Sequence, residues 1–462
     1  MSDLIRLRTV AAFAVVTVML MLASMTYQIS ACAAKNIGTD YIVKYKECAV
    51  WMQEDSSVPF DVVSEDEMRR LDNDGLLEWY EPDDEMTLFE GESSLYYSDD
   101  KWDLVLVNAD SAFENNYLGQ NVRVGVIDSG INPHADIEER LLDGQSYIAD
   151  ADPADTADNY GHGTYVAGLI TGAGNDGYMG AAPGAQVIPL KITDGKTVTV
   201  STVCRAIYGG IDDYDCDILN LSLGIKTEHE SLKEAVDYAE KKGVVMVAAA
   251  GNNGTAAKNY PAAYNSVIGV GAVDETGTWF YHSNHNESVF ITAPGVNVKT
   301  VGKNSGYEIK SGTSFSVPYV TAAAAVMLSI DDTLTPSDIM EILAKTSVDK
   351  GDTGYDEYYG EGILDLGGCV SYLTGGMMPC VFLPETGAAS QIKNNSGVTV
   401  SCTYFLAEYD ENGVCLNVIS KEVTIPAKGA IDIEAPQENT NYGQFVLKID
   451  TIMPLAMARK SR

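Results

Sequence analysis

The run VRVGVIDSG at residues 122–130 is the part of this sequence that decides the fold. Its apolar residues are nearly continuous up to an aspartate, which is typical of a strand buried on both faces of a parallel sheet. The Ser-Gly pair that follows predicts a turn. Asp128 would then lie at the carboxyl edge of the sheet, where open α/β folds hold their active sites. Taken alone, the motif is explained better by a turn or cap role for Asp128.

Apolar strand-like runs alternate with helical stretches after this strand. We predict further strands at residues 185–192, 217–223, 244–251 and 266–273. We predict one helix that begins near residue 162 and others at residues 201–214, 230–242, 314–330 and 334–346. This alternation predicts an α/β fold in which helices flank a parallel sheet.

Three further motifs place polar residues beside glycines. His162 stands in GHGTYVAG, where small neighbours let other groups approach the imidazole, although such a histidine alone is more often a hydrogen-bonded turn residue. Ser314 stands in SGTSFSVP at a predicted helix start, which suits either anion binding and acyl transfer or a plain N-cap. Asn252 follows a buried strand in AAAGNNG, where its amide could bind a negative oxygen or its backbone could make a left-handed turn.

In combination, the motifs DSG, HGTYVAG, AAAGNNG and GTSFSVP, together with LNLSLG and NYPAAYNSVIGVGA, resemble the subtilisin-like serine proteases. The resemblance covers residues from about 102 to 366. It implies that Ser314 attacks a peptide carbonyl, that His162 transfers the proton, and that Asp128 orients and stabilises the imidazolium. It also implies that Asn252 and the Ser314 N–H bind the oxyanion.

The resemblance further implies polypeptide substrates and a place where they bind. Ser222, Leu223 and Gly224 would form an edge that pairs with an extended peptide backbone. The primary pocket would be bordered by the following three residues: Ala249, Ala250 and Gly251. Two positions depart from the family pattern, because Tyr165 stands in place of a histidine and Phe315 in place of a methionine.

No catalytic metal or other catalytic cofactor is expected. The stretch ITGAGNDGYMGAAPGA resembles the segment that carries a calcium loop in many subtilisin-like proteins, but it is shorter than the best calcium-binding versions. Calcium needs six to eight oxygen ligands, which the side chains here do not visibly supply. The sequence therefore leaves two readings open, a structural Ca²⁺ site or a simple turn at Asn175 and Asp176.

The N-terminus predicts an export signal at residues 1–34, because Arg6 and Arg8 precede a long uncharged stretch with an apolar centre. Three fates stay open. The signal could be cleaved after Ala33, Cys32 could be acylated as part of a lipobox, or the uncut stretch could span a bilayer. The protein would be secreted in the first case and attached to the membrane or cell surface in the other two.

The remaining segments suggest accessory modules around a peptidase domain at residues 99–375. Residues 35–98, with predicted strands at 40–46 and 76–80 and an acidic helix at 64–72, resemble in position and pattern a small α+β propeptide that chaperones and inhibits its enzyme. A cut between about residues 90 and 101 would remove it. Residues 376–462 predict a β-sandwich, because short strand-like runs alternate there with polar turns.

The charge balance limits the classes of partner. The 462 residues include 66 acidic and 30 basic side chains, with a formal net charge of -36, which argues against a general nucleic-acid-binding face. The eight cysteines follow neither a zinc pattern nor a dense disulfide pattern. The sequence is also compatible with two other classes of protein. One is a catalytically silent, peptide-binding relative of the proteases, and the other is a surface protein dominated by its β module.

Overall fold

In the computed structural model of this chain, the described residues are 39–53, 57–89, 101–175, 178–374 and seven strands after residue 379. They form two compact units, one that ends at Asp83 and one that begins at Asp84. The predicted export signal and Cys32 lie outside the described residues.

The first unit is a three-stranded antiparallel sheet with one α-helix. Its order is β2-β1-β3, so that the first strand in the chain is central. Met68 and Leu71 on the helix are buried with Val43 of the central strand. The elements are β1 (Asp40–Tyr45), the 3-10 helix η1 (Glu47–Met52), β2 (Asp61–Ser64), α2 (Glu65–Asn73) and β3 (Leu77–Pro82).

A seven-stranded sheet is the centre of the second unit, and all its strand pairs are parallel. The predicted parallel α/β sheet is thereby confirmed. The strand that contains the VRVGVID run lies inside the sheet, with neighbours on both sides. In spatial order the strands are β13 (Ile291–Pro294), β12 (Val267–Val273), β11 (Val245–Ala249), β9 (Ile218–Leu221), β5 (Arg123–Asp128), β7 (Gln186–Lys191) and β6 (Gln145–Ser146).

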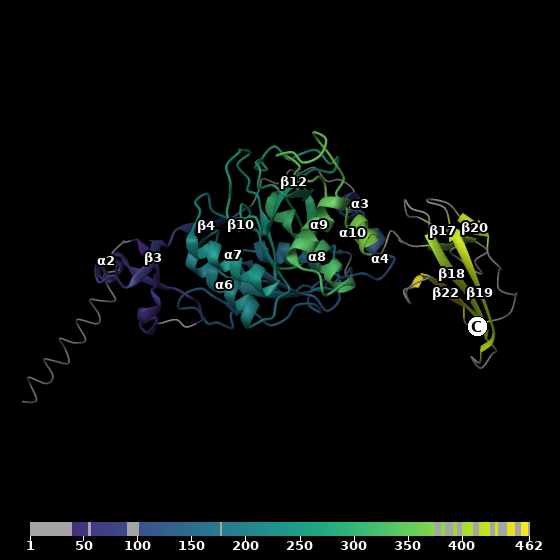
Figure 1. Cartoon of the computed structure of the whole chain (residues 1–462), viewed down its shortest axis with the longest axis horizontal. Helices are drawn as coiled ribbons and strands as arrows, with labels where there is room; N and C mark the ends of the chain where they lie inside the picture. Colours follow the sequence, from purple (N-terminus) through teal and green to yellow (C-terminus); the bar gives the residue numbers. More distant parts are fainter. Residues whose placement is uncertain are drawn as a thin grey trace, which may run out of the picture. The chain divides into compact units, whose positions relative to one another are not determined.

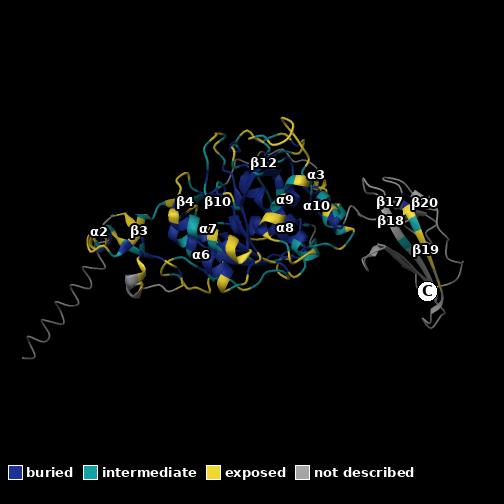
Figure 2. Ribbon diagram, viewed as in Figure 1, coloured by how far each residue is buried: buried dark blue, intermediate teal, exposed yellow. Residues whose placement is uncertain are grey.

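Helices cover this sheet, and α6 and α7 pack side by side (Figure 1). Figure 2 shows buried residues through the sheet and in α8, whose sequence is apolar on every side, as expected of a helix enclosed by protein. The helices are α3 (Trp102–Leu106), α4 (Asp110–Phe113), α5 (His162–Thr171), α6 (Val200–Asp212), α7 (Glu230–Lys242), α8 (Val317–Ile330), α9 (Pro336–Thr346) and α10 (Leu366–Leu373).

The start of α8 differs from the prediction. We expected the helix to begin at Ser314, but residues Thr313–Phe315 form the separate 3-10 turn η2, and α8 begins at Val317. Proline is favoured in the first helical turn, where its missing N–H costs nothing, and Pro318 occupies that turn. The apolar stretch Thr313–Ile330 is long enough to cross a membrane, but 83% of it is buried inside the domain.

Two smaller strand groups accompany the main sheet. In the first, β4 (Glu85–Leu88) lies between β8 (Thr197–Thr199) and β10 (Leu223–Gly224) and is antiparallel to both. The second is the hairpin of β14 (Val298–Val301) and β15 (Tyr307–Lys310).

The C-terminal strands form two antiparallel sheets, one with the order β16-β17-β20 and one with the order β19-β18-β21-β22. This agrees with a β-rich segment, and the sandwich stays a prediction. The strands are β16 (Cys380–Leu383), β17 (Gln391–Asn394), β18 (Val400–Tyr409), β19 (Cys415–Ile425), β20 (Ala430–Asp432), β21 (Asn441–Lys448) and β22 (Pro454–Lys460).

Candidate active site

Strand β5 and helix α5 bring an aspartate and a histidine into direct contact. Asp128 is the last residue of β5, His162 is the first residue of α5, and both side chains are fully buried. The imidazole Nδ1 lies 2.9 and 2.8 Å from the two carboxylate oxygens. Because an ionised carboxylate only accepts hydrogen bonds, Nδ1 carries the hydrogen and Nε2 is the basic nitrogen of the neutral ring.

A second buried carboxylate, which we did not predict from the sequence, joins the turn after β5 to the start of α5. Asp158 accepts hydrogen bonds from the Ser129 hydroxyl at 2.8 Å and from the Gly161 N–H at 2.6 Å. Its other oxygen accepts from the N–H and the hydroxyl of Thr164, at 2.9 and 2.6 Å. The only sequence signal was an aspartate four residues before the histidine. Its negative charge suits a helix N-terminus and fixes the element that carries His162.

Glycines allow the two motifs to approach so closely. Gly161 has a φ of 108°, a conformation that residues with a Cβ rarely adopt. At Gly163 a Cβ would lie 2.2 Å from the carbonyl oxygen of Gly130. The glycines on both sides of His162 are therefore required by backbone geometry and close packing, which agrees with the close approach expected from the GHGTYVAG motif.

Ser314 lies in the η2 turn and is fully buried. Its hydroxyl donates to the carbonyl oxygen of Ser222 at 2.9 Å, and the Ser222 hydroxyl donates to the carbonyl oxygen of Ser314 at 2.9 Å. The next residue, Phe315, packs on the imidazole of His162, with ring centroids 5.4 Å apart. The turn that carries the serine is thus in contact with the histidine of α5.

The two ends of the Asn252 amide have different surroundings. Its Oδ1 accepts hydrogen bonds from the N–H and the hydroxyl of Thr313, both at 2.9 Å. Its Nδ2 is buried and has no acceptor among the residues that the structure describes. A buried donor without a partner costs free energy and calls for an explanation, such as a ligand that binds there. Thr313 therefore orients an amide whose donor end is available.

The predicted substrate edge carries an extended strand of the chain itself. Leu223 and Gly224 pair with β4 in an antiparallel register. Near this edge is a pocket of about 410 Å³, and Gly224, Asn252 and Asn259 are among the residues that line it. The edge predicted from the sequence is therefore able to pair with an extended backbone.

The other predicted border of the pocket follows β11. Ala249 ends this strand, and Ala250 continues its pairing with a hydrogen bond from its N–H to Val270 O at 3.0 Å. The Ala250 carbonyl accepts from the buried amide of Asn259 at 2.8 Å. A Cβ at Gly251 would lie 2.3 Å from that amide nitrogen. The Asn259 side chain therefore fills the space that a side chain at position 251 would need.

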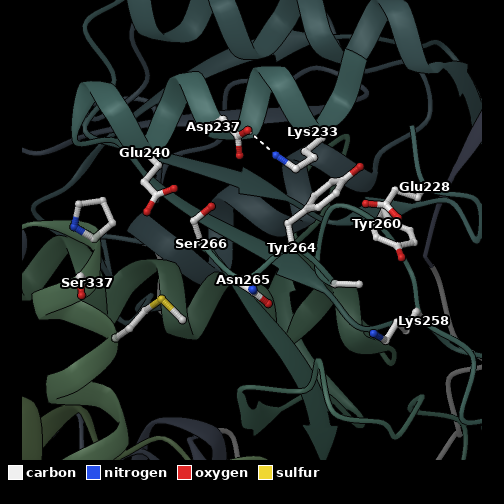
Figure 3. Close-up of a pocket in the computed structure, with 13 residues that line it drawn as sticks. Glu228, Lys233, Asp237, Glu240, Lys258, Tyr260, Tyr264, Asn265, Ser266 and Ser337 are labelled. Atoms are coloured by element: carbon white, nitrogen blue, oxygen red, sulfur yellow. Dashed lines mark hydrogen bonds and ion pairs between the residues drawn. The ribbon is translucent and has the colours of Figure 1, made fainter. Parts of the chain in front are cut away.

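A larger pocket of about 490 Å³ lies elsewhere in the second unit (Figure 3). It is lined by Glu228 and by residues of α7, of the segment 258–266 and of the first half of α9, and none of the four predicted catalytic residues is among them. In Figure 3 a dashed line joins Lys233 to Asp237, which form an ion pair within α7. This pocket is separate from the candidate active site.

The remaining sequence features have local contacts. Tyr165, which departs from the family pattern, donates its hydroxyl to Glu308 at 3.1 Å. In the predicted calcium segment, Asn175 donates to the carbonyl oxygen of Ala135 at 3.1 Å, and Asp176 lies outside the described residues. No group of three histidine, cysteine or acidic side chains in the described part of the chain is placed to hold a metal ion, and structural calcium stays a prediction.

Comparison with known proteins connects this geometry to a family. A family model described as the subtilase family matches residues 119–362. Subtilisin DY from Bacillus licheniformis is 36% identical over 270 residues, which cover 56% of this chain and 95% of the relative. Subtilisin Savinase from Lederbergia lenta is 33% identical over 266 residues, covering 57% and 96%. The minor extracellular protease Epr from Bacillus subtilis (strain 168) is 35% identical over 271 residues, covering 57% and 41%.

Proposed function

Because this chain belongs to the subtilase family and is a serine endopeptidase, we propose that Ser314 is its nucleophile, His162 its proton carrier and Asp128 the group that orients the imidazole. The observation that carries this proposal is the contact of His162 Nδ1 with both oxygens of a fully buried carboxylate. This contact leaves Nε2 as the base, which is the tautomer that a serine protease needs.

The proposed reaction uses these residues in two half-reactions. His162 Nε2 takes the hydroxyl proton as the Ser314 oxygen attacks a peptide carbonyl, and it then gives the proton to the leaving amine. Water hydrolyses the resulting ester by the same steps in reverse. Asn252 Nδ2 and the Ser314 N–H would bind the negative oxygen in both halves. The buried and unpaired state of Asn252 Nδ2 among the described residues supports this role.

We propose in addition that the enzyme acts outside the cell on polypeptides and that residues 35–98 are its propeptide. The similarity to a protease named as extracellular and the apolar stretch after Arg8 support export. The pairing of β4 with the predicted substrate edge supports an inhibitory N-terminal segment. In this proposal residues 99–375 are the peptidase domain, with Ala249, Ala250 and Gly251 beside its primary pocket, and residues 376–462 are an accessory β module.

The test replaces each of the three proposed catalytic side chains, Ser314, His162 and Asp128, in turn. We expect Ser314→Ala, His162→Ala and Asp128→Asn each to lose nearly all peptidase activity, and double variants to lose little more, because the three side chains act as one unit; such non-additivity is known for subtilisin itself. The measurement is kcat/KM on a chromogenic peptide, with Ser337→Ala as a control that removes an exposed hydroxyl. A fluorophosphonate should label the wild type and fail to label Ser314→Ala.

Losses that multiply across the double variants, or a fluorophosphonate adduct on another serine, would contradict the assignment. A protein with normal folding and no adduct at all would favour the catalytically silent alternative. The Tm of each variant is compared with that of the wild type, so that a loss of activity can be distinguished from a loss of folded structure.

A further inference from the structure

Strand β4 occupies the position that an extended substrate would take. It lies between β8 and β10, and it has antiparallel partners on both sides. The register pairs Leu88 with Leu223, and the Leu88 N–H donates to the carbonyl oxygen of Lys196 at 2.9 Å. Backbone groups on both sides of the cleft are therefore satisfied by one segment of this chain.

The direction of β4 leads to the nucleophile. The residue after the strand, Phe89, donates its N–H to Ser222 O at 3.1 Å, and the Ser314 hydroxyl donates to the same oxygen at 2.9 Å. The backbone N–H of Phe89 and the serine oxygen thus converge on one acceptor. The carbonyl of Phe89 is the first peptide carbonyl in the chain beyond this point.

The side chains of this segment are held as specifically as its backbone. Met86 and Leu88 are fully buried, whereas Glu85 is exposed to solvent. This agrees with the alternation of side chains along a strand. A Cβ placed on Gly224 would lie 2.8 and 2.9 Å from the Cε2 and Cζ atoms of the Phe89 ring. The ring therefore lies against a position where only glycine leaves room for it.

We propose that the Phe89–Glu90 bond is the first bond that this enzyme cuts in its own chain, and that Gly224 makes the adjoining pocket select a large aromatic residue before the cut bond. The proposal rests on the function proposed above and deepens it. The Ser314 oxygen bonds to the Phe89 carbonyl carbon, and the bond from that carbon to the Glu90 nitrogen breaks. His162 moves the serine proton to that nitrogen. Water then hydrolyses the ester, which leaves a Phe89 carboxylate and restores the serine.

The first experiment identifies the N-termini that appear as the purified full-length precursor matures, by mass spectrometry at successive times. We expect the earliest new N-terminus to be Glu90, formed at a rate that does not change on dilution. Phe89→Asp should slow its appearance by roughly 10- to 100-fold, because a charged group replaces the ring in the pocket. Asp72→Ala, at an exposed position of α2 outside the groove, is the control and should mature normally.

The outcomes separate this inference from the proposed function. If Ser314→Ala also matures, when made without other proteases, the proposed catalytic assignment fails. If Ser314→Ala stays intact but the earliest N-terminus of the wild type lies after residue 90, only the assignment of the bond is wrong. Equal rates for Phe89→Asp and the wild type would likewise overturn it.

A second experiment exchanges volume between the ring and the glycine. Gly224→Ala should slow maturation, and Phe89→Ala in the same chain should restore it, because the smaller side chain leaves space for the new methyl group. In trans, mature Gly224→Ala should lose roughly 10- to 100-fold in kcat/KM on a peptide with Phe before the bond and keep its value on the matching Ala peptide. The new Cβ would also lie 3.0 Å from Tyr260 O, so thermal unfolding is measured alongside. Equal losses on both peptides would overturn the role of Gly224.

Discussion

Three asparagines close together in the fold, Asn252, Asn259 and Asn284, differ in how many hydrogen bonds their side-chain amides make. Asn284 uses both ends of its amide, since its Oδ1 accepts from the Asn253 N–H at 2.9 Å and its Nδ2 donates to the Ala257 carbonyl at 3.0 Å. Asn259 donates to the Ala250 carbonyl. Asn252 is held at its oxygen end, and its nitrogen end is unpaired within the described residues. The first kind of amide holds a loop together, and the last is suited to binding charge that appears during a reaction.

We therefore expect Asn252→Ala to lower kcat and leave KM nearly unchanged. The expected loss is roughly 100- to 1,000-fold, which is the magnitude known for the oxyanion-binding asparagine of subtilisin itself. Steady-state kinetics on a small peptide provide the measurement, and Asn253→Ala, an exposed neighbour, is the control. An unchanged kcat would show that the amide does not bind the oxyanion.

At the scale of elements, the start of α5 depends on a buried carboxylate that belongs to neither β5 nor α5. Asp158 joins the turn that follows Asp128 to the turn that carries His162. We expect Asp158 to position the Asp128–His162 pair, because its oxygens contact Ser129, Gly161 and Thr164 rather than either proposed catalytic side chain.

Asp158→Ala should leave several buried donors without an acceptor, at a cost of about 1–3 kcal/mol for each. We expect a lower Tm and a fall in kcat that is larger than the change in KM. In the pH profile of kcat/KM, we expect a shift of the pH at which activity is lost through protonation of His162. Asp155→Ala, an exposed aspartate in the same loop, should change none of these. If Asp158→Ala loses stability but keeps the wild-type pH profile, the carboxylate has a purely structural role.

The elements also show which parts of the structure were predictable. We predicted α7 with the bounds it has, because a periodic run there ends at Gly243, whose φ of 80° suits a helix cap. The predicted substrate edge at Ser222–Gly224 includes β10, but we missed β8 and assigned no bounds to β4, because strands of three or four residues show no usable period and the pairing of these two joins residues more than 100 positions apart. Asp158 was missed for another reason, because its partners belong to two separate motifs and it lies in neither of them. The family motifs indicated the four proposed catalytic residues but did not indicate the hydrogen bonds of Asp158 that hold two of these motifs together.

At the scale of the whole second unit, a buried polar pair joins its first helix, α3, to the central helix α8. Asp103, near the start of that unit's helices, is buried and accepts a hydrogen bond from the hydroxyl of Tyr319 in α8. Burial raises the pKa of the Asp103 carboxyl above its usual 3.8, and the tyrosine hydrogen bond offsets part of this rise. The folded state therefore binds this proton more tightly than the unfolded state does.

Asp103 should accordingly make folding stability depend on pH. Its contribution is fully present below the unfolded pKa near 3.8 and is lost as the pH rises through the higher folded pKa. We expect the free energy of unfolding of the parent to fall relative to that of Asp103→Asn over this window. Urea unfolding of both chains in a Ser314→Ala background, which prevents self-digestion, measures the difference. Asp110→Asn, at an exposed site, is the control, and a difference independent of pH would contradict the prediction.

In the maturation proposed above, the placement of β4 between β8 and β10 links activity to the volume into which the enzyme is released. While the chain is intact, β4 is tethered beside its groove, and a short tether gives an effective concentration on the order of millimolar. Cutting the tether removes that advantage, and occupancy of the groove then follows the amount of free fragment in solution. On this proposal, a cut enzyme at high concentration stays inhibited by its own fragment. Dilution of the same enzyme then frees the groove by mass action, without any further signal.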